Sequence, residues 1–562
     1  MKLITIVLAS VTLTAVMTDA SSAQTPGRIL PEVRVFEPEW IREGRFGELV
    51  LLDERRVLVN HRQDSLLALL SGAFWAFSRG PGGILETSRF SAEPVTGLVL
   101  GDDADLKDGI LLAGTTRWPV FPISTHFGRA YVWDVVGDDY VFSGALDVPD
   151  PQHGTGFAFT VAVVDHDAVV VGRYGEILTT GLRGSMYLFE RTPGGWVNTQ
   201  KFWVPQSQVP VSSGCGYSLA YDDGYLAAGE LNSLQVNVFR RDASGRFVYH
   251  QRISAPQGVG FRNDFGVKVA IEGDLMAIGN PGKVDNGAPS TVHIYRNLQG
   301  VWTPEETLVA SDGYVTQLSS GVVNDDFGRS IVIDGGRIAI GARHSARGVV
   351  PTSGSQFLGN AYVFEKIAGH WEEVYQLQNS VPEPGAFYAN SIDMDGDAVI
   401  LGALSFPFMG YNNVGAAFAF ELPFGDAACV GAANSTGGPG EIEVTGDRRI
   451  GIGRLFLTAR ELPAGSACLF LASPTAGFVA NPAGSQGNLC LQGSIARFVS
   501  LAGQASATGI FEAQLDMAAI PTPQAGPIAL QPGDTYTFQA WYRDANPGPV
   551  SNFTAARTVE FR

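Results

Sequence analysis

Residues that could do chemistry are sparse in this sequence, and few are spaced for a known reaction. The densest group is the acidic run 102–108, which is Asp-Asp-Ala-Asp-Leu-Lys-Asp between two glycines. Alternate carboxylates on a tight loop can converge on a hard cation, which prefers six to eight oxygen ligands. A second acidic run, 393–397, begins with the pattern of a strand end, so a plain turn is favoured there. Cation binding is therefore the first chemistry to consider.

Familiar catalytic patterns are missing from the sequence. Its eight histidines are scattered, and it has no His-Glu-x-x-His, Gly-x-Ser-x-Gly, phosphate-binding loop or Cys-x-x-Cys motif. We expect His293 to lie in the core, His370 to be a solvated turn residue, and Cys215 to be a small buried residue of a strand. Catalytic residues that meet from distant parts of a fold leave no local motif, so an enzyme stays an alternative.

The composition is that of a long, acidic and turn-rich chain. It has 562 residues, including 68 Gly and 31 Pro, and a formal net charge of −18. The length favours two or more domains. The acidic balance argues against a nucleic-acid partner, because phosphate binding needs a basic face and no Lys/Arg cluster is present.

The first residues have the pattern of a secretory signal. Lys2 precedes the apolar run 3–17, and Ser21-Ser22-Ala23 supplies small residues for cleavage after Ala23. No later stretch approaches the roughly 20 apolar residues of a membrane span. We therefore expect residues 1–23 to be a signal peptide. The mature protein would be exported and soluble, with no transmembrane segment, and would be secreted, periplasmic or at the cell surface.

One pattern recurs about seven times between residues 30 and 422. Its clearest copy has Asp-Phe-Gly at 326–328, Ile-Gly-Ala at 340–342, Gly-Asn-Ala-Tyr-Val-Phe-Glu at 359–365 and Gly-His-Trp at 369–371. We place the Phe-Gly position of the repeats at Phe46-Gly47, Thr96-Gly97, Gly156-Phe157, Gly216-Tyr217, Phe265-Gly266, Phe327-Gly328 and Ala386-Phe387. Short alternating strands and acidic, Gly-rich turns follow each position, four strands to a repeat. This pattern predicts a seven-bladed β-propeller.

The seventh repeat lacks the fourth strand of the others. A strand-like segment, Val33–Trp40, precedes the first repeat and has no repeat of its own. We predict that this segment completes the seventh blade, because closing the ring removes an exposed sheet edge. The alternative, an open solenoid, would leave the segment without a partner.

The Phe-Gly, Ile-Gly-Ala and Gly-x-Ala-Tyr-Val-Phe-Glu elements resemble the FG-GAP repeat family, whose best-known member is the propeller of integrin α subunits. The resemblance covers roughly residues 30–422 and points to a protein of the exported bacterial type. It implies an extracellular propeller that binds a ligand or mediates adhesion. It does not imply one activity.

FG-GAP propellers often carry a calcium loop in the first hairpin of a blade. The stretch 101–109 resembles such a loop, with Asp103, Asp105 and Asp108 as ligands. Lys107 occupies the fifth position, where a ligand belongs, and the final aspartate is missing, so a plain hairpin is the alternative. Calcium is the one cofactor that the sequence suggests.

Beyond residue 422 the repeat disappears. Residues 426–562 have short alternating strands between Gly, Pro and Asn turns, which predicts a C-terminal β-sandwich and makes the whole chain all-β. This region has three cysteines, so at most one pair can form within it, and spacing does not select the pair. Parts of the region resemble a C-terminal module of exported bacterial repeat proteins. The resemblance implies a Cys429–Cys490 disulfide with Cys468 free.

We expect a monomeric, non-catalytic binding or adhesion protein that presents propeller loops to an extracellular protein or glycan. The alternatives are a propeller enzyme acting on an extracellular carbohydrate or phosphoester, and a structural envelope component. Carboxylates or histidines at the channel mouth would favour an enzyme, whereas an aromatic patch on the blade-connecting loops would favour binding. The long loops 120–127 and 346–358 are the first places to expect ligand contacts.

Overall fold

A computed structural model gives the fold of the chain. It describes residues 28–29, 32–35, 45–53, 56–62, 71–80, 83–92, 98–116, 119–120, 125–126, 128–150, 156–178, 181–182, 184–205, 214–231, 233–256, 264–282, 290–318, 321–349, 351–353, 356–407, 414–450, 453–523, 526–545 and 548–562. The predicted signal peptide, residues 1–23, lies outside them. No helix in this part of the chain is long and apolar enough to cross a membrane.

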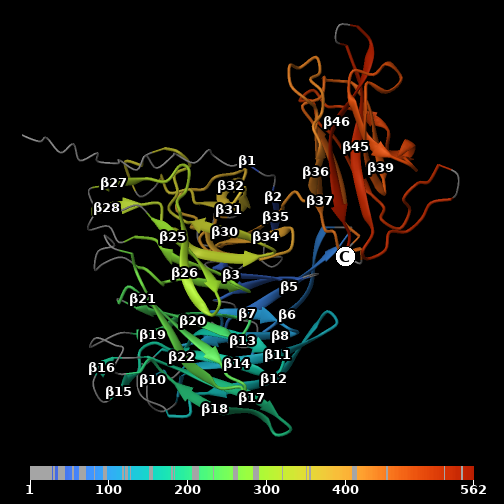
Figure 1. The fold of residues 1–562 in the computed structure, drawn as a ribbon. Coiled ribbons are helices and arrows are strands. Elements are labelled where there is room, and N and C mark those ends of the chain that lie inside the picture. Colours follow the sequence, from blue (N-terminus) through green and yellow to red (C-terminus); the bar gives the residue numbers. More distant parts are fainter. Residues whose placement is uncertain are drawn as a thin grey trace, which may run out of the picture.

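Seven antiparallel sheets, each with four chain segments in series, form the blades of a propeller (Figure 1). Blade 1 consists of β3 (Phe46–Asp53), β4 (Arg56–His61), β5 (Ala73–Gly80) and β6 (Gly83–Phe90). Blade 2 consists of β7 (Ala104–Lys107), β8 (Ile110–Thr115), β11 (Arg129–Val136) and β12 (Asp139–Asp147). Blade 3 consists of β13 (Phe157–Asp165), β14 (Ala168–Arg173), β17 (Ser185–Thr192) and β18 (Gly195–Phe202). Blade 4 consists of β19 (Gly214–Asp222), β20 (Tyr225–Leu231), β21 (Gln235–Arg241) and β22 (Phe247–Ser254). Blade 5 consists of β23 (Val269–Glu272), β24 (Leu275–Asn280), β25 (Thr291–Leu298) and β26 (Val301–Leu308). Blade 6 consists of β29 (Phe327–Asp334), β30 (Arg337–Ala342), β31 (Asn360–Ile367) and β32 (His370–Leu377). The short strand β1 (Arg28–Ile29) lies parallel to β32.

Blade 7 is completed by the start of the chain, as predicted. Its strands are β33 (Tyr388–Asp395), β34 (Ala398–Ala403), β35 (Ala416–Glu421) and β2 (Glu32–Val35). β2 pairs antiparallel with β35, with Glu32 opposite Phe420 and Val35 opposite Ala417. The strand is shorter than expected within the described residues, because 36–44 lie outside them. The ring is therefore closed by chain segments from both ends of the propeller sequence.

Three small hairpins extend from the connections between blade strands. They are β9 (Pro119–Val120) with β10 (Thr125–His126), β15 (Ile177–Leu178) with β16 (Gly181–Leu182), and β27 (Val315–Leu318) with β28 (Gly321–Asn324). The propeller core lies between adjacent blades, where the buried apolar side chains of one blade contact those of the next.

One backbone position repeats around the ring and explains the Phe-Gly motif. A buried residue is followed by a residue with φ between 59° and 96° at Gly47, Gly101, Ala158, Gly216, Gly266, Gly328 and Ala389. In six blades the glycine of the second strand approaches the carbonyl of this left-handed residue in the next blade. An added Cβ would lie 2.0 Å from Gly47 O at Gly402, and 2.0 Å from Gly266 O at Gly229. Only glycine fits this contact between blades.

The structure corrects four of the seven Phe-Gly assignments. The equivalent pairs are Leu100-Gly101, Phe157-Ala158, Cys215-Gly216 and Tyr388-Ala389. The sequence assignments were displaced by one to four residues in these repeats. In these repeats Cys, Leu or Tyr replaces the buried Phe, or Ala replaces the left-handed Gly. The residue types of the motif therefore change, while its backbone geometry is retained.

Hydroxyl groups reinforce the contact between blades. Three residues after the buried position, Thr160 Oγ1 donates to Gly216 O (2.9 Å) and Ser218 Oγ donates to Gly266 O (2.7 Å). Ser330 and Ser391 make the same bond to the carbonyls of Ala389 and Gly47. A β-bulge between the buried residue and this hydroxyl residue brings the hydroxyl to the next blade.

The C-terminal region is a β-sandwich. One sheet has the order β36 (Asp426–Cys429), β46 (Val550–Glu560), β45 (Thr535–Asp544), β39 (Ala467–Ser473) and β42 (Ala496–Arg497), with β43 (Gly503–Gln504) also on β39; the other is β37 (Glu441–Gly446), β38 (Leu455–Arg460) and β44 (Phe511–Leu515). A third pair is β40 (Thr475–Ala480) with β41 (Asn488–Gln492), and two 3₁₀ turns are η4 (Pro482–Gly484) and η5 (Val499–Leu501). Apolar side chains of both larger sheets share one core.

The disulfide between Cys429 and Cys490 is present, as the resemblance implied. It joins the end of β36 to β41, with the two Cα atoms 6.2 Å apart. Cys468 is free and buried. The bond ties the β40–β41 pair to the main sheet of the sandwich.

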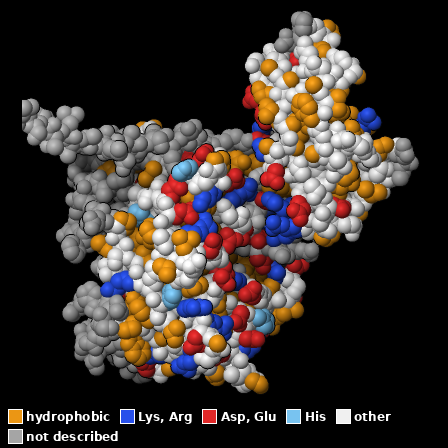
Figure 2. All heavy atoms as spheres, viewed as in Figure 1, with side chains coloured by type: hydrophobic (Ala, Val, Ile, Leu, Met, Phe, Trp, Pro, Cys, Tyr) orange, Lys and Arg blue, Asp and Glu red, His pale blue; other side chains and the backbone are white. Residues whose placement is uncertain are grey.

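Charged residues hold the sandwich against the propeller where the hairpin turns of blades 6 and 7 meet it. Asp397, in the turn after β33, accepts hydrogen bonds from Arg337 of blade 6 (2.9 Å) and from Arg448 of the sandwich (2.7 and 2.8 Å). Arg449 pairs with Asp395 at 2.7 Å. Figure 2 shows basic side chains in blue where the sandwich meets the propeller, next to acidic side chains in red on the propeller.

Gly402→Ala tests the contact that closes the ring. We expect it to lower the stability of the propeller by about 3 kcal/mol, because the new Cβ would overlap Gly47 O and force blades 7 and 1 apart. Calorimetric melting of the purified protein measures the effect. Gly194→Ala is the matched control, since a Cβ there would have only Thr192 Oγ1 near it, at 3.7 Å. Equal melting temperatures for the two variants would contradict the assigned role of the contact.

Asp397→Asn tests the contact between propeller and sandwich. The Asp397 side chain is only 5% exposed and accepts hydrogen bonds from two arginines. Its loss leaves Arg448 without this carboxylate, while Arg337 keeps its pair with Glu365 at 2.7 Å, and we expect a cost of about 3 kcal/mol. We expect the two parts of the chain to melt in separate transitions. Asp274→Asn removes a pair in which the carboxylate is 63% exposed, and there we expect a loss of about 0.5 kcal/mol. If Asp397→Asn melts in a single transition at the wild-type temperature, Asp397 does not couple the sandwich to the propeller.

Candidate functional site

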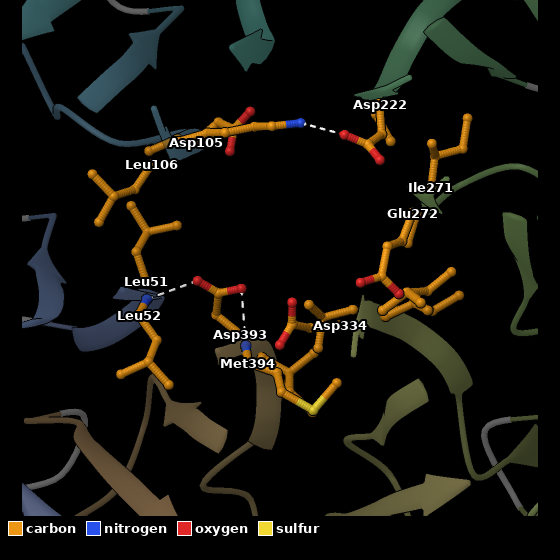
Figure 3. A pocket seen from close by; sticks show the side chains of 18 of the residues that line it. Leu51, Leu52, Asp105, Leu106, Asp222, Ile271, Glu272, Asp334, Asp393 and Met394 are labelled. Atoms are coloured by element: carbon orange, nitrogen blue, oxygen red, sulfur yellow. Dashed lines mark hydrogen bonds and ion pairs between the residues drawn. The ribbon is translucent and has the colours of Figure 1, made fainter. Parts of the chain in front are cut away.

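The innermost strands of the seven blades enclose a central channel of about 530 Å³. Its walls come from β3, β7, β13, β19, β23, β29 and β33, whose alternating residues face the axis. Figure 3 shows Asp105, Asp222, Glu272, Asp334 and Asp393 around the open space. The channel therefore concentrates carboxylates that are far apart in the sequence.

Each of these carboxylates already has a structural partner in a neighbouring blade. Asp393 Oδ2 accepts from Leu52 N (2.7 Å), Asp105 Oδ2 accepts from Val163 N (2.7 Å) and Asp222 Oδ2 accepts from Gly273 N (2.8 Å). Glu272 and Asp334 accept in the same way from backbone N–H groups of the next turn. The channel carboxylates are thus part of the bonding that holds adjacent blades together, whichever ligand the channel takes.

Burial inside the ring raises the pKa of several of these groups. It raises the pKa of Asp393 to about 8 and that of Asp103 to about 6, with smaller contributions from neighbouring carboxylates. Burial also raises the pKa of Asp334 to about 6. For Asp222 burial acts in the same direction, but hydrogen bonds from Lys107 and Gly273 outweigh it and lower the pKa. Carboxyl groups in one channel therefore differ in protonation near neutral pH.

Lys107 links two blades that are not neighbours. Its Nζ donates to Asp222 Oδ1 at 2.6 Å and to Tyr221 O at 3.3 Å, so blade 2 contacts blade 4 across the end of blade 3. This ion pair offsets part of the negative charge on one side of the channel.

A second feature of the channel is a ring of side chains where the innermost strands begin. The residue after the left-handed position contributes to this ring in each blade. Its members are Glu48, Asp102, Phe159, Tyr217, Val267, Arg329 and Asn390. Five of them line a chamber of about 150 Å³ that also contains Asp103 and Lys268. We call this ring and its chamber the loop mouth, because it lies at the end opposite the hairpin turns.

Three aromatic rings stand together at the loop mouth. The centroids of Phe159 and Tyr217 are 5.1 Å apart, and Tyr174, which follows β14, lies 4.9 Å from Phe159 and 5.4 Å from Tyr217. All three side chains are half-buried. Their edge-to-face and tilted contacts fix the rings in place. The result is a preformed aromatic surface in a concave, polar-lined mouth.

Glu48 and Asp102 of the loop mouth share one arginine, Arg62, and a second, Arg45, lies 3.8 Å from Glu48 Oε2. Arg62 donates to Glu48 Oε1 at 2.6 Å and also bonds Asp102. The second oxygen of Asp102 accepts from Thr116 N (2.6 Å) and Thr116 Oγ1 (2.7 Å). Blades 1 and 2 therefore present a closed hydrogen-bonded network to the mouth rather than free charge.

The structure separates the three residues proposed as calcium ligands. Asp103 and Asp105 direct carboxylate oxygens to Val161 N and Val163 N of blade 3, whereas Asp108 lies exposed in a two-residue hairpin turn. Among the described residues, no three His, Cys, Asp or Glu side chains are grouped so that they could hold a metal ion. The expected loop is a strand and a tight turn, and calcium binding stays a prediction without a geometric basis at this position.

The other single residues are placed much as expected. Cys215 is fully buried at the Phe position of blade 4, and burial raises the pKa of its thiol. His293 is buried on β25 between Thr291 and Thr307, and burial lowers its pKa to about 4. His370 lies exposed at the start of β32. None of the three lines the channel.

The sequence pointed to other loops as ligand sites. Loop 120–127 lies mostly outside the described residues, and no described residue of 346–358 lines the loop mouth. The aromatic group was missed because its members come from different repeats. One signal was available: the position after the left-handed residue is the least uniform of the repeat, and it is aromatic in two successive blades.

Comparisons with known proteins find similarity among solved structures. No protein-family model and no curated protein matches the chain. Among solved structures, it is similar to a protein from Lactobacillus plantarum (12% identity, TM-score 0.38, 60% of this chain and 86% of that chain). It is also similar to a candidate 6-phosphogluconolactonase from Bacteroides fragilis (13%, 0.37, 60% and 85%) and to the periplasmic gluconolactonase of Pseudomonas aeruginosa (14%, 0.35, 63% and 86%). These similarities are too low to carry a conclusion about this chain.

Asp393→Asn tests the buried carboxyl group of the channel. Its pKa is about 8 in the folded protein and about 4 in an unfolded chain. Between these values the folded state holds the additional proton, so stability falls as pH rises, by up to about 1.4 kcal/mol per pH unit. We expect the melting temperature of the variant to fall less than that of the wild type between pH 5 and pH 8.

Melting curves at a series of pH values measure this difference. Asp138→Asn, which removes an exposed carboxylate from the outer hairpin turn of blade 2, should keep the wild-type slope. A variant slope as steep as the wild type, or steeper, would show that Asp393 does not hold a proton in this range.

Proposed function

We propose that this protein is an exported, non-catalytic binding protein whose loop mouth holds a glycan. The observation that carries the proposal is the aromatic group of Phe159, Tyr174 and Tyr217 in a concave mouth. Phe159 and Tyr217 line one chamber with Arg329 and Lys268, and Tyr174 packs against both aromatic rings. Preformed pockets that combine aromatic surface with a few placed polar groups are typical ligand sites.

A sugar ring suits this combination better than a protein surface does. One face of a pyranose carries C–H groups that pack on the negative face of an aromatic ring, while its hydroxyls need donors and acceptors at the edge. The chamber is small, with a volume of about 150 Å³. Protein partners instead bury broad surfaces of about 800 Å² on each side.

The channel carboxylates do not favour the enzyme alternative. They are numerous, but those around the open space each accept a backbone N–H from a neighbouring blade. We assign them to the stability of the ring, since a general acid or base needs an oxygen directed at the substrate. Binding without turnover is therefore the proposal.

Export and family membership are parts of the same proposal. The signal-like residues 1–23 and the Cys429–Cys490 disulfide support an oxidising, extracytoplasmic location. The Phe-Gly pairs at 46–47, 265–266 and 327–328 occupy one equivalent backbone position, which supports an FG-GAP type of repeat. We infer a monomer that acts at or near the cell surface.

Binding to a glycan array, followed by calorimetric titration of the best ligand, tests the function. We expect Tyr217→Ala to weaken binding at least tenfold, or about 1.4 kcal/mol, because the ring contact is lost. Tyr217→Phe retains the ring and should bind within about twofold of the wild type. Phe478→Ala, which removes an aromatic side chain that is 64% exposed on the sandwich, is the matched control and should leave affinity unchanged.

Two results would contradict the proposal. The first is that the wild type binds no glycan, or binds one equally well after Tyr217→Ala. The second is cleavage of the bound glycan, detected by mass spectrometry after prolonged incubation, which would instead establish the enzyme alternative.

A further inference from the structure

The loop mouth is divided into sectors by its side chains. Blades 1 and 2 present the Glu48–Arg62–Asp102 network, in which opposite charges are already paired. Blades 3 and 4 present the aromatic rings of Phe159 and Tyr217. Blades 5 and 6 follow directly around the ring and present Lys268 and Arg329 to the same chamber. Aromatic and cationic sectors therefore lie side by side.

The two cations of the third sector differ from the other basic residues of the innermost strands and turns. Among the described residues, neither the Lys268 nor the Arg329 side chain makes an ion pair or hydrogen bond. Lys107, by contrast, is paired with Asp222. The charge of Lys268 is felt by Asp103, whose pKa it lowers against the larger effect of burial, but the two groups are not in contact.

The chain has a net charge of −18, so a group of unpaired cations contrasts with its acidic background. Two of them in adjacent blades, both half-buried in one chamber, form a local positive sector within an acidic protein. Such a sector attracts an anion and gains little from any neutral ligand. Arg329 can offer a planar pair of N–H donors and Lys268 a compact point charge.

We propose that the bound glycan is acidic and carries a carboxylate, as a hexuronic acid does. Its sugar ring packs on Phe159 and Tyr217, and its carboxylate accepts hydrogen bonds from Arg329 and Lys268. This inference rests on the proposed glycan-binding function and adds the class of sugar. Arg45 and Arg62 together balance the charges of Glu48 and Asp102, so the network of blades 1 and 2 adds no net repulsion of the carboxylate.

An array of oligosaccharides rich in hexuronic acid, printed beside their methyl esters, tests the inference. Within each pair the ester lacks the negative charge and carries one additional methyl group. We expect the wild type to bind the acids at least tenfold more tightly than the esters, and this preference to shrink when NaCl is raised from 50 to 500 mM. Arg329→Gln and Lys268→Gln should each weaken binding of the acids about tenfold and change binding of the esters less than twofold.

Arg246→Gln is the charge-matched control, because this arginine is exposed in an outer hairpin turn of blade 4 and lies outside the mouth. It should leave the preference unchanged. Equal binding of acids and esters would overturn the charge inference while leaving glycan binding intact. Binding of neither, together with an empty general glycan array, would overturn the proposed function itself. Melting temperatures of the three variants confirm that each is folded.

Discussion

The close contact between a second-strand glycine and the left-handed residue of the next blade is the constraint on which the propeller depends. A blade can approach its neighbour this closely only where no Cβ intervenes, as at Gly402 and Gly229. The hydroxyl of Ser218 or Ser391 then bonds the same carbonyl from the innermost strand. Since the contact recurs around the ring, each blade is positioned by the one before it. The segment Glu32–Val35 supplies the last strand of blade 7, so the series of blades closes into a ring and does not form an open stack.

The candidate site follows from the same constraint. A left-handed residue turns the chain at the start of each innermost strand, so the residue after it stands at the mouth of the channel in all seven blades. The packing of the blades does not determine the type of this residue, which leaves it free to serve a ligand. Two aromatic residues and a cation occupy it in blades 3, 4 and 6. Deeper in the channel, the carboxylates of residues such as Asp393 and Asp105 instead accept hydrogen bonds from backbone N–H groups. The ligand-facing position thus lies at the start of each innermost strand, and the structural positions lie deeper along it.

Much of the fold could be predicted because local sequence patterns recur in each repeat. Alternating strands, acidic turns and a missing fourth strand predicted seven blades and their closure by the segment around Val33. The position of the buried residue could not be recovered where Cys215 or Tyr388 replaces Phe, since backbone geometry rather than side-chain identity is retained. The candidate site was harder still. Phe159 and Tyr217 are separated by an entire repeat and meet only in the ring, and Asp103 has the spacing of a calcium ligand but bonds to blade 3 instead.

A crystal structure of the protein with its best array ligand would test the central idea most directly. We expect one sugar ring to lie against Phe159 and Tyr217, with its carboxylate within hydrogen-bonding distance of Arg329 and Lys268, and little movement of the seven blades. A ligand bound on the sandwich, or at the hairpin-turn end of the channel, with the loop mouth free, would contradict it.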